Sequence, residues 1–190
     1  MTTHAFLIDE MILAGRMLHQ RGIYSGRAGN MSARLPDGNL LITRSGVHKG
    51  LLTAADFLLL AADGTPLEAG KPTTEAPLHL ASYARPDVGA VLHAHPPACT
   101  TLAMLDQTLI TDRSEEGHIM LGRVPTLPPS PSGDAEGAAR WGAAVSDGAW
   151  AALLAQHGVI VAGRDVRDAL ARLETCEFLA EVQWRMRVWR

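Results

Sequence analysis

The histidines of this sequence include a pair that could bind a divalent metal ion. His93 and His95 close a strand predicted over residues 88–93, and side chains two residues apart in a strand point to the same face. Pro96 and Pro97 end the strand directly afterwards, so both imidazoles aim at one spot. Catalytic zinc sites use three protein ligands, with imidazole nitrogens at about 2.0–2.1 Å, and keep one position open. A third ligand must therefore come from elsewhere in the chain.

His157 is the best candidate for that third ligand. It stands between the apolar stretches 151–154 and 159–161, where a solvated histidine would be out of place. Gly158 follows it and permits a bulge or the close approach of another group. The alternative interpretation is a hydrogen-bonded core histidine. Surface or structural roles are expected for four of the eight histidines, which have no partner visible in the sequence: His4, His19, His48 and His118.

Glu75 could carry a proton beside such a metal. Glu75 begins a helix predicted over residues 75–84, where the helix dipole favours a carboxylate. One interpretation is therefore a plain N-terminal cap, which stabilises the helix by about 0.3–1 kcal/mol. The functional interpretation is a general base, because a metal makes a carbonyl electrophilic but some group must still move the proton. His79 lies four residues later on the same helix face, either supporting Glu75 or simply forming part of that face.

Two short glycine-containing turns could bind an anion. The segments 26–30 and 43–46 lie next to predicted strands, and backbone N–H groups and hydroxyls in such turns cradle phosphate. Thr73 and Thr74, at a helix N-terminus, could supply a third wall. The only two lysines of the sequence, Lys49 and Lys71, flank these segments.

Short strands and helices alternate along the chain and must position these groups. The periodicity predicts helices over residues 4–20, 75–84, 97–105 and 133–145 and after Asp165, and strands over residues 40–43, 57–60, 88–93, 151–154 and 159–162. The pairs Asp168/Arg172 and Glu181/Arg185 are expected on the solvent face of the last helix. This alternation predicts an α/β layered domain with a central sheet covered by helices.

Length and composition narrow the protein class. A chain of 190 residues predicts one domain spanning residues 1–190, and a net charge of −3 argues against a nucleic-acid or anionic-membrane partner. Two cysteines far apart signal no disulfide framework. The N-terminus has no basic segment, and no apolar run is long enough for a membrane span, so we expect a cytoplasmic protein.

Taken together and in order, these segments resemble the class II aldolase/adducin family from about Met11 to Trp184. The resemblance is carried by five ordered motifs and the last helix: Gly29-Asn-Met-Ser-Ala-Arg34, Ile42-Thr-Arg-Ser-Gly46, Lys71-Pro-Thr-Thr-Glu75, Ala90-Val-Leu-His-Ala-His95, Gln156-His-Gly158, and Gly163-Arg-Asp165 before that helix with Glu177-Phe-Leu179 inside it. It implies a three-layer α/β/α domain with a central, mainly antiparallel sheet. It also implies a small phosphorylated sugar substrate and a homotetramer with active sites at subunit interfaces.

The resemblance assigns roles to particular residues. The resemblance implies that His93, His95 and His157 bind one divalent metal per subunit, most commonly Zn²⁺. It implies that Glu75 is the catalytic acid/base. The phosphate-binding positions are Gly29, Asn30, Ser45, Gly46, Thr73 and Thr74. Where family aldolases often have proline, this chain has Arg44, so a guanidinium is expected to alter or reinforce the phosphate pocket.

The resemblance favours a metal-dependent lyase of small ketose phosphates, with an aldolase leading: reversible aldol cleavage through a zinc-bound enediolate. A methylthioribulose-1-phosphate dehydratase is the close alternative, because the sequence ends at Arg190 without the C-terminal tyrosine that family aldolases use as proton donor. Family epimerases usually have aspartate at the Glu75 position, which argues against that branch. A decarboxylase of 3-oxo sugar acid phosphates is a third possibility. A non-catalytic, adducin-like scaffold is the alternative from another class, and the intact ligand set argues against it.

Overall fold

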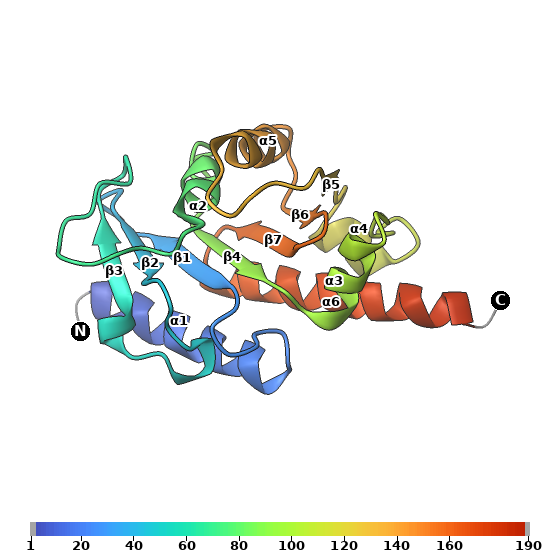
Figure 1. Ribbon diagram of the computed structural model, residues 1–190, viewed down its shortest axis with the longest axis horizontal. Coiled ribbons are helices and arrows are strands. Elements are labelled where there is room, and N and C mark those ends of the chain that lie inside the picture. Colours follow the sequence, from blue (N-terminus) through green and yellow to red (C-terminus); the bar gives the residue numbers. More distant parts are fainter. Residues whose placement is uncertain (1–2, 189–190) are drawn as a thin grey trace.

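A seven-stranded sheet forms the centre of the computed structural model, which describes residues 3–188 (Figure 1). The strand order is β3-β2-β1-β4-β7-β6-β5, and every pairing is antiparallel except that of β5 with β6. The strands are β1 (Asn30–Arg34), β2 (Leu40–Thr43), β3 (Phe57–Leu60), β4 (Ala90–Ala94), β5 (Thr126–Leu127), β6 (Ala151–Leu154) and β7 (Gly158–Gly163). The mainly antiparallel sheet expected from the sequence is confirmed.

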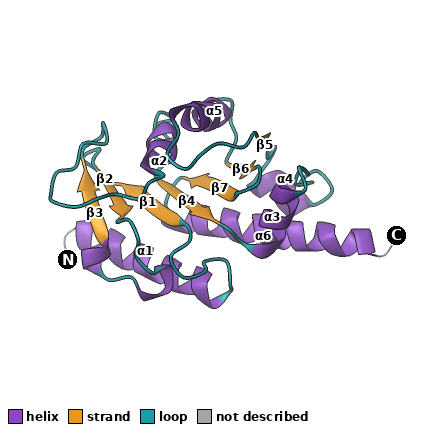
Figure 2. Ribbon diagram, in the orientation of Figure 1, coloured by secondary structure: helices purple, strands orange, loops and turns teal. Residues whose placement is uncertain are grey.

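Helices cover both faces of the sheet and complete the predicted α/β/α layers (Figure 2). The helices are α1 (Thr3–Gln20), α2 (Ala76–Ser82), α3 (Pro97–Met104), α4 (Glu115–Met120), α5 (Ala135–Ser146) and α6 (Val166–Val188), with 3₁₀ turns at η1 (Lys49–Leu51) and η2 (Ala54–Asp56). Helices α2 and α5 lie on one face, and α1, α3 and α6 lie on the other (Figure 1). No helix within residues 3–188 is long and apolar enough to cross a membrane.

Alternation along β4 decides which layer each of its side chains meets. Leu92 packs in the apolar cluster with α1, α3 and α6, whereas Val91 packs with Trp141 in the cluster beneath α2 and α5. Because side chains alternate between faces, His93 shares the face of Val91. The first histidine of the pair is therefore delivered to the α2 side, where the helix led by Glu75 lies.

Four elements of the structure were not expected from the sequence: β1, η1, α4 and β5. One predicted surface position is also wrong. Arg172 is only 4% exposed, because α6 packs lengthwise against the sheet and turns this residue inward. Its guanidinium lies 4.2 Å from the ring of Trp150 and donates hydrogen bonds to the Asp168 carboxylate and to the Met120 carbonyl. The Glu181–Arg185 pair is exposed, as expected.

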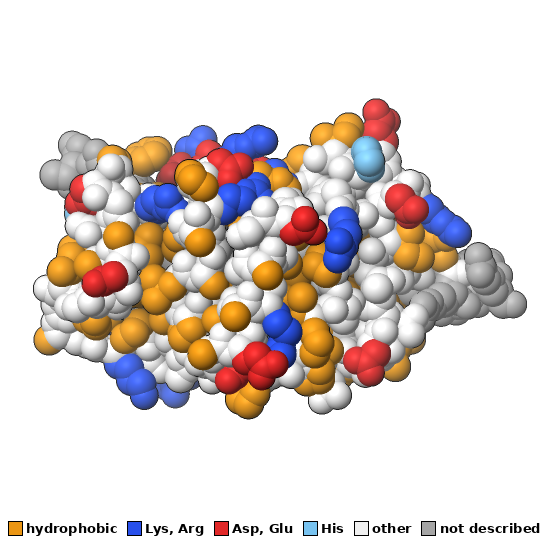
Figure 3. Space-filling view, turned by 90° about the horizontal axis from the view of Figure 1, so that it is seen from above, with side chains coloured by type: hydrophobic (Ala, Val, Ile, Leu, Met, Phe, Trp, Pro, Cys, Tyr) orange, Lys and Arg blue, Asp and Glu red, His pale blue; other side chains and the backbone are white. Residues whose placement is uncertain are grey.

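The molecular surface over α2 and α5 carries mixed charge. In the view onto this side, acidic and basic side chains are interspersed with hydrophobic ones (Figure 3). This mixture agrees with the small net charge of −3.

Candidate metal and acid–base site

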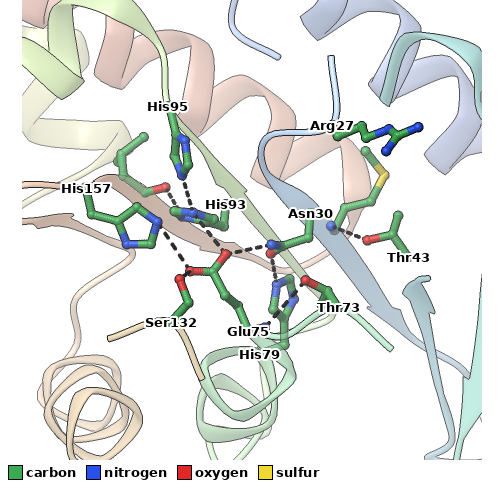
Figure 4. A network of polar contacts seen from close by, with 12 residues as sticks. Arg27, Asn30, Thr43, Thr73, Glu75, His79, His93, His95, Ser132 and His157 are labelled. Atoms are coloured by element: carbon green, nitrogen blue, oxygen red, sulfur yellow. Dashed lines mark hydrogen bonds and ion pairs between the residues drawn. The ribbon is translucent and has the colours of Figure 1, made fainter. Parts of the chain in front are cut away.

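Three imidazoles meet at one end of the sheet (Figure 4). His93 lies on β4, His95 follows that strand, and His157 lies in the tight turn between β6 and β7. Since β7 pairs with β4 so that Val159 stands opposite Ala94, this turn is brought beside the end of β4. The three ring centroids are 4.7–4.8 Å apart, and one candidate ligand atom from each lies within 4.8 Å of the others. The structure thus brings together the predicted ligand set.

The backbone around His157 is shaped for this approach. Gln156 has a left-handed φ of 59°, and its N–H donates to the Ala103 carbonyl at 3.0 Å. A Cβ placed on Gly158 would lie 2.5 Å from the Ala94 carbonyl oxygen and 2.7 Å from Cδ2 of His95. The glycine is therefore needed because another group approaches closely, as the sequence suggested.

The donor set fits a divalent metal. His93 Nδ1 lies 2.9 Å from the Val159 carbonyl, which can only accept, so Nδ1 carries the proton and the Nε2 lone pair faces the cluster. Burial, followed by the neighbouring His95 and His157, holds the pKa of His93 well below its usual range. Burial and His157 lower the pKa of His95 in the same way. Neutral imidazoles are the form that binds zinc and similar metals, so these rings are held in the ligating state.

Glu75 faces the three imidazoles and does not act as a plain helix cap. It precedes α2 and is 5% exposed, and its side chain makes no capping hydrogen bond. One carboxylate oxygen, Oε2, lies 3.1 Å from His93 Nε2, and the other, Oε1, lies 3.4 Å from His157 Nε2. The hydroxyl of Ser132 donates to Oε1 at 3.5 Å. A carboxylate in this position can exchange a proton with a substrate beside the imidazoles.

Asn30 also turns toward Glu75. Its Nδ2 donates to Glu75 Oε2 at 2.7 Å, and its Oδ1 lies 2.5 Å from His79 Nε2. The β1–β4 register places Asn30 opposite His93, which explains the convergence. The sequence suggested a phosphate-binding role for Asn30, and the contact with Glu75 carried no sequence signal. The contact of Ser132 was missed as well, and nothing in its loop sequence marks it.

The predicted phosphate-binding segments lie side by side. The N–H of Thr73 donates to the Thr43 carbonyl at 3.0 Å, and the N–H of Ser45 donates to the Lys71 carbonyl at 3.0 Å. Ser45, Gly46 and Thr74 are exposed, whereas Thr73 is buried and its hydroxyl accepts from the Glu75 N–H at 3.4 Å. Phosphate binding by these residues stays a prediction.

Two glycines in these turns hold conformations that other residues rarely adopt. Gly29 has φ +79°, and a Cβ there would lie 2.5 Å from the His93 carbonyl oxygen. Gly46 has φ +78°. Gly29 therefore lets its turn pack directly against the strand that carries His93.

A buried lysine ties these two turns together. Lys49 is 2% exposed, and its ammonium donates to the Arg27 carbonyl at 2.9 Å and to the Val47 carbonyl at 2.8 Å. Burial lowers its pKa to about 8, against the opposing attraction of Asp56 and Glu75. The ammonium thus joins the turn before β1 to the turn after β2.

The guanidinium of Arg44 is engaged by other groups of the fold. Its guanidinium pairs with Glu68 at 3.0 Å and donates to the carbonyls of Ala55, Phe57 and Ala69. These acceptors engage the guanidinium, and the expectation that Arg44 alters or reinforces the phosphate pocket stays a prediction.

Comparisons with known proteins show the family and the fold of this chain. The family model of the class II aldolase and adducin N-terminal domain matches residues 9–184. A methylthioribulose-1-phosphate dehydratase from Gluconacetobacter diazotrophicus is 39% identical, over 90% of this chain and 89% of that protein. A 3-oxo-tetronate 4-phosphate decarboxylase from Escherichia coli is 35% identical, over 93% and 85%. The crystal structure of L-fuculose-1-phosphate aldolase from Thermus thermophilus superposes with a TM-score of 0.87, at 31% identity over 97% of this chain and 96% of that one.

Proposed function

This chain belongs to the class II aldolase and adducin family and is an enzyme of the aldolase type, and we propose that its reaction is the dehydration of methylthioribulose 1-phosphate. The observation that carries the proposal is the pairing of three converging imidazoles with one buried carboxylate, Glu75, in a chain similar to such a dehydratase along nearly its whole length. The sequence favoured aldol cleavage. The comparison favours the dehydratase, which the sequence offered as the alternative.

The residues divide the chemistry among them. A divalent metal held by His93, His95 and His157 would act as a Lewis acid toward the substrate carbonyl and acidify the neighbouring carbon. Glu75 removes the proton from that carbon, and the C–O bond to the hydroxyl on the next carbon breaks. The departing hydroxide takes the proton back from Glu75, so one water is lost and the carboxylate is restored. The enol that remains rearranges to a diketone phosphate.

Other contacts serve orientation. The amide of Asn30 holds one oxygen of Glu75, and the exposed turn at Ser45 and Gly46 offers the Ser45 hydroxyl and the Gly46 N–H to the phosphate. Anchoring the phosphate away from the reacting carbons reduces the entropic barrier to reaction.

The hydroxyls of Tyr24 and Tyr83 are both engaged within the fold, which favours elimination over an aldol cleavage that uses either of them as proton donor. The sequence contains two tyrosines, and the hydroxyl of Tyr24 is buried and donates to the Asn30 carbonyl at 3.0 Å. The hydroxyl of Tyr83 lies 2.7 Å from Ser32 Oγ. Both hydroxyls thus have partners within the fold.

Product analysis tests the proposal. Zinc-loaded protein is given methylthioribulose 1-phosphate, and the products are identified by mass spectrometry. Dehydration gives one phosphorylated product lighter by one water. Aldol cleavage would instead give an aldehyde and dihydroxyacetone phosphate, and would overturn the proposal in favour of the aldolase. Release of carbon dioxide from a 3-oxo sugar acid phosphate would point to the decarboxylase.

Substitution of the acid/base isolates its role. Glu75→Gln keeps the shape and the metal content, and turnover is expected to fall by about 10²–10⁴-fold. Glu181→Gln, an exposed glutamate on α6, is the matched control and should keep full turnover. Full turnover by Glu75→Gln would show that another group moves the proton.

Metal identity and assembly complete the proposal. We expect one Zn²⁺ per subunit and a homotetramer with active sites at its interfaces, both on the strength of the family resemblance. Elemental analysis and light scattering of purified protein measure these two properties. Lack of a stoichiometric divalent metal, together with no turnover of any ketose phosphate, would favour a scaffold.

A further inference from the structure

A line of buried polar side chains runs behind Glu75. It begins at the Tyr83 hydroxyl, 2.7 Å from Ser32 Oγ, which in turn lies 2.7 Å from Nδ1 of His79. The opposite ring nitrogen, Nε2, lies 2.5 Å from Oδ1 of Asn30, whose Nδ2 donates to Glu75. Figure 4 shows the last part of this line, with Asn30 between the ring of His79 and the carboxylate. Ser32 is 1% exposed and His79 is 0% exposed.

Two regular elements build this line. Glu75, His79 and Tyr83 follow one another at four-residue spacing along the face of α2 that meets the sheet. Asn30 and Ser32 are two residues apart on β1 and point to one face of the sheet. Side chains from the helix therefore alternate with side chains from the strand. Two of the five come from β1, the strand that the hydrophobic pattern did not reveal.

The direction of every hydrogen bond in the line follows from its acidic end. An ionised carboxylate only accepts, so the NH₂ end of Asn30 must face Glu75 and the amide oxygen must face His79. That oxygen also only accepts, so His79 carries its proton on Nε2. In the neutral ring, Nδ1 then accepts from the Ser32 hydroxyl, whose oxygen accepts from Tyr83.

We propose that His79, with its Nε2–H directed at Asn30 and its Nδ1 accepting from Ser32, is a positioning residue that fixes the amide of Asn30 and through it the carboxylate of Glu75. The proposal rests on the proposed role of Glu75 as acid/base. An unrestrained asparagine amide can rotate by a half turn at little steric cost, and would then present an oxygen to the carboxylate. The Nε2–H of His79 prevents this rotation. It also occupies the amide oxygen, which leaves the second N–H of Asn30 as the amide group that can reach a substrate oxygen.

The tautomer of His79 is measurable without any substrate. Zinc-loaded protein labelled with ¹⁵N-histidine is studied by long-range ¹H–¹⁵N correlation at neutral pH, where protonated and unprotonated ring nitrogens have well-separated shifts. The signals of His79 are assigned by their loss in His79→Gln. The expected result is a neutral ring with the proton on Nε2. A proton on Nδ1, or a doubly protonated ring, would overturn the proposal even if the substrate is not the proposed one.

Kinetics then separate positioning from simple support of the fold. Ser32→Ala removes the hydroxyl that faces Nδ1, and we expect kcat to fall by about 10-fold with KM and zinc content unchanged, as for the loss of one oriented hydrogen bond. Ser32→Thr restores the hydroxyl and should recover most of kcat. The matched control is Ser82→Ala. Ser82 is also a buried serine, but it lies on α2 and its hydroxyl accepts from Trp141.

The outcomes are distinguishable. Equal losses of kcat in Ser32→Ala and Ser82→Ala would indicate a structural role only, and would overturn the proposal. If wild-type protein turns over no ketose phosphate, the proposed function fails, while the NMR result still decides the tautomer of His79.

Discussion

Replacing Gly158 by alanine would test the geometry of the three imidazoles directly. The glycine is the first residue of β7, directly after His157, and its φ lies outside the left-handed region, so alanine is compatible with the backbone. The added Cβ would lie 2.7 Å from Cδ2 of His95 and 2.5 Å from the Ala94 carbonyl oxygen. Contacts under 3.0 Å force a shift, and one of these neighbours is backbone that yields little.

The size of the expected effect follows from these distances. To reach the 3.4 Å at which ordinary contact begins, the ring of His95 must retreat by about 0.7 Å, or the β6–β7 turn must lift by a similar amount. Metal–ligand distances tolerate only about 0.2 Å. We therefore expect zinc affinity to fall at least 10–100-fold, the range seen when the support of a ligand is disturbed. Turnover at limiting zinc should fall in parallel.

Competition with a chromogenic chelator would measure zinc affinity, and circular dichroism would confirm that the variant is folded. Gly142→Ala is a suitable control because its Cβ would lie 3.3 Å from the Cβ of Ala81, between α5 and α2 and remote from the imidazoles. It should bind zinc as the wild type does. If Gly158→Ala also bound zinc with unchanged stoichiometry and affinity, His95 would not be a ligand held by this contact, and the reasoning would be refuted.

Three further predictions concern the metal, the phosphate turns and acid stability. His95→Ala should abolish stoichiometric metal binding and turnover together, as measured by elemental analysis and kinetics, and retention of metal with activity would contradict the assignment. Lys49→Met removes the buried ammonium between the two turns, so KM for a ketose phosphate should rise about 10-fold with a smaller change in kcat. An unchanged KM would show that Lys49 does not support phosphate binding. Burial lowers the pKa of His79 from 6.5 to about 3, so below pH 6.5 the unfolded chain binds a proton that the folded chain does not. Stability should therefore be lost as pH falls from 6.5 toward 3, by about 1.4 kcal/mol per unit from this group. Urea unfolding of wild type and His79→Gln at several pH values should show a shallower dependence in the variant.

The sequence predicted the fold best where a single helix or strand carries a clear pattern of apolar residues. The strands β2 and β3 were predicted with the bounds observed, since Leu40–Thr43 and Phe57–Leu60 are mainly apolar runs between turns. The strand β1 was not predicted. Its polar residues Asn30 and Ser32 are buried, because His79 and Glu75 satisfy them from another element. A hydrophobic pattern cannot reveal burial that depends on partners elsewhere in the chain.

Arg172 illustrates the same limit on a helix. Its spacing from Asp168 is typical of an exposed ion pair, and the pair does form at 3.1 Å. The side chain is nevertheless buried, because Trp150 and the Met120 carbonyl offer it partners on the inner side of α6. Local spacing predicts which side chains are neighbours, but it does not predict which layer covers them.

The sequence by itself determined the relations that lie within one element. Two-residue periodicity put His93 and His95 at one strand end, helical periodicity put Glu75 and His79 on one face, and a glycine after His157 allowed a close approach. Only the tertiary structure decided that β7 pairs with β4 and brings His157 to the other two, and that the amide of Asn30 reaches Glu75. The physical reason is that periodicity is a property of local backbone geometry. Pairing between distant segments follows instead from the burial of their apolar faces and from the need to satisfy each buried polar group.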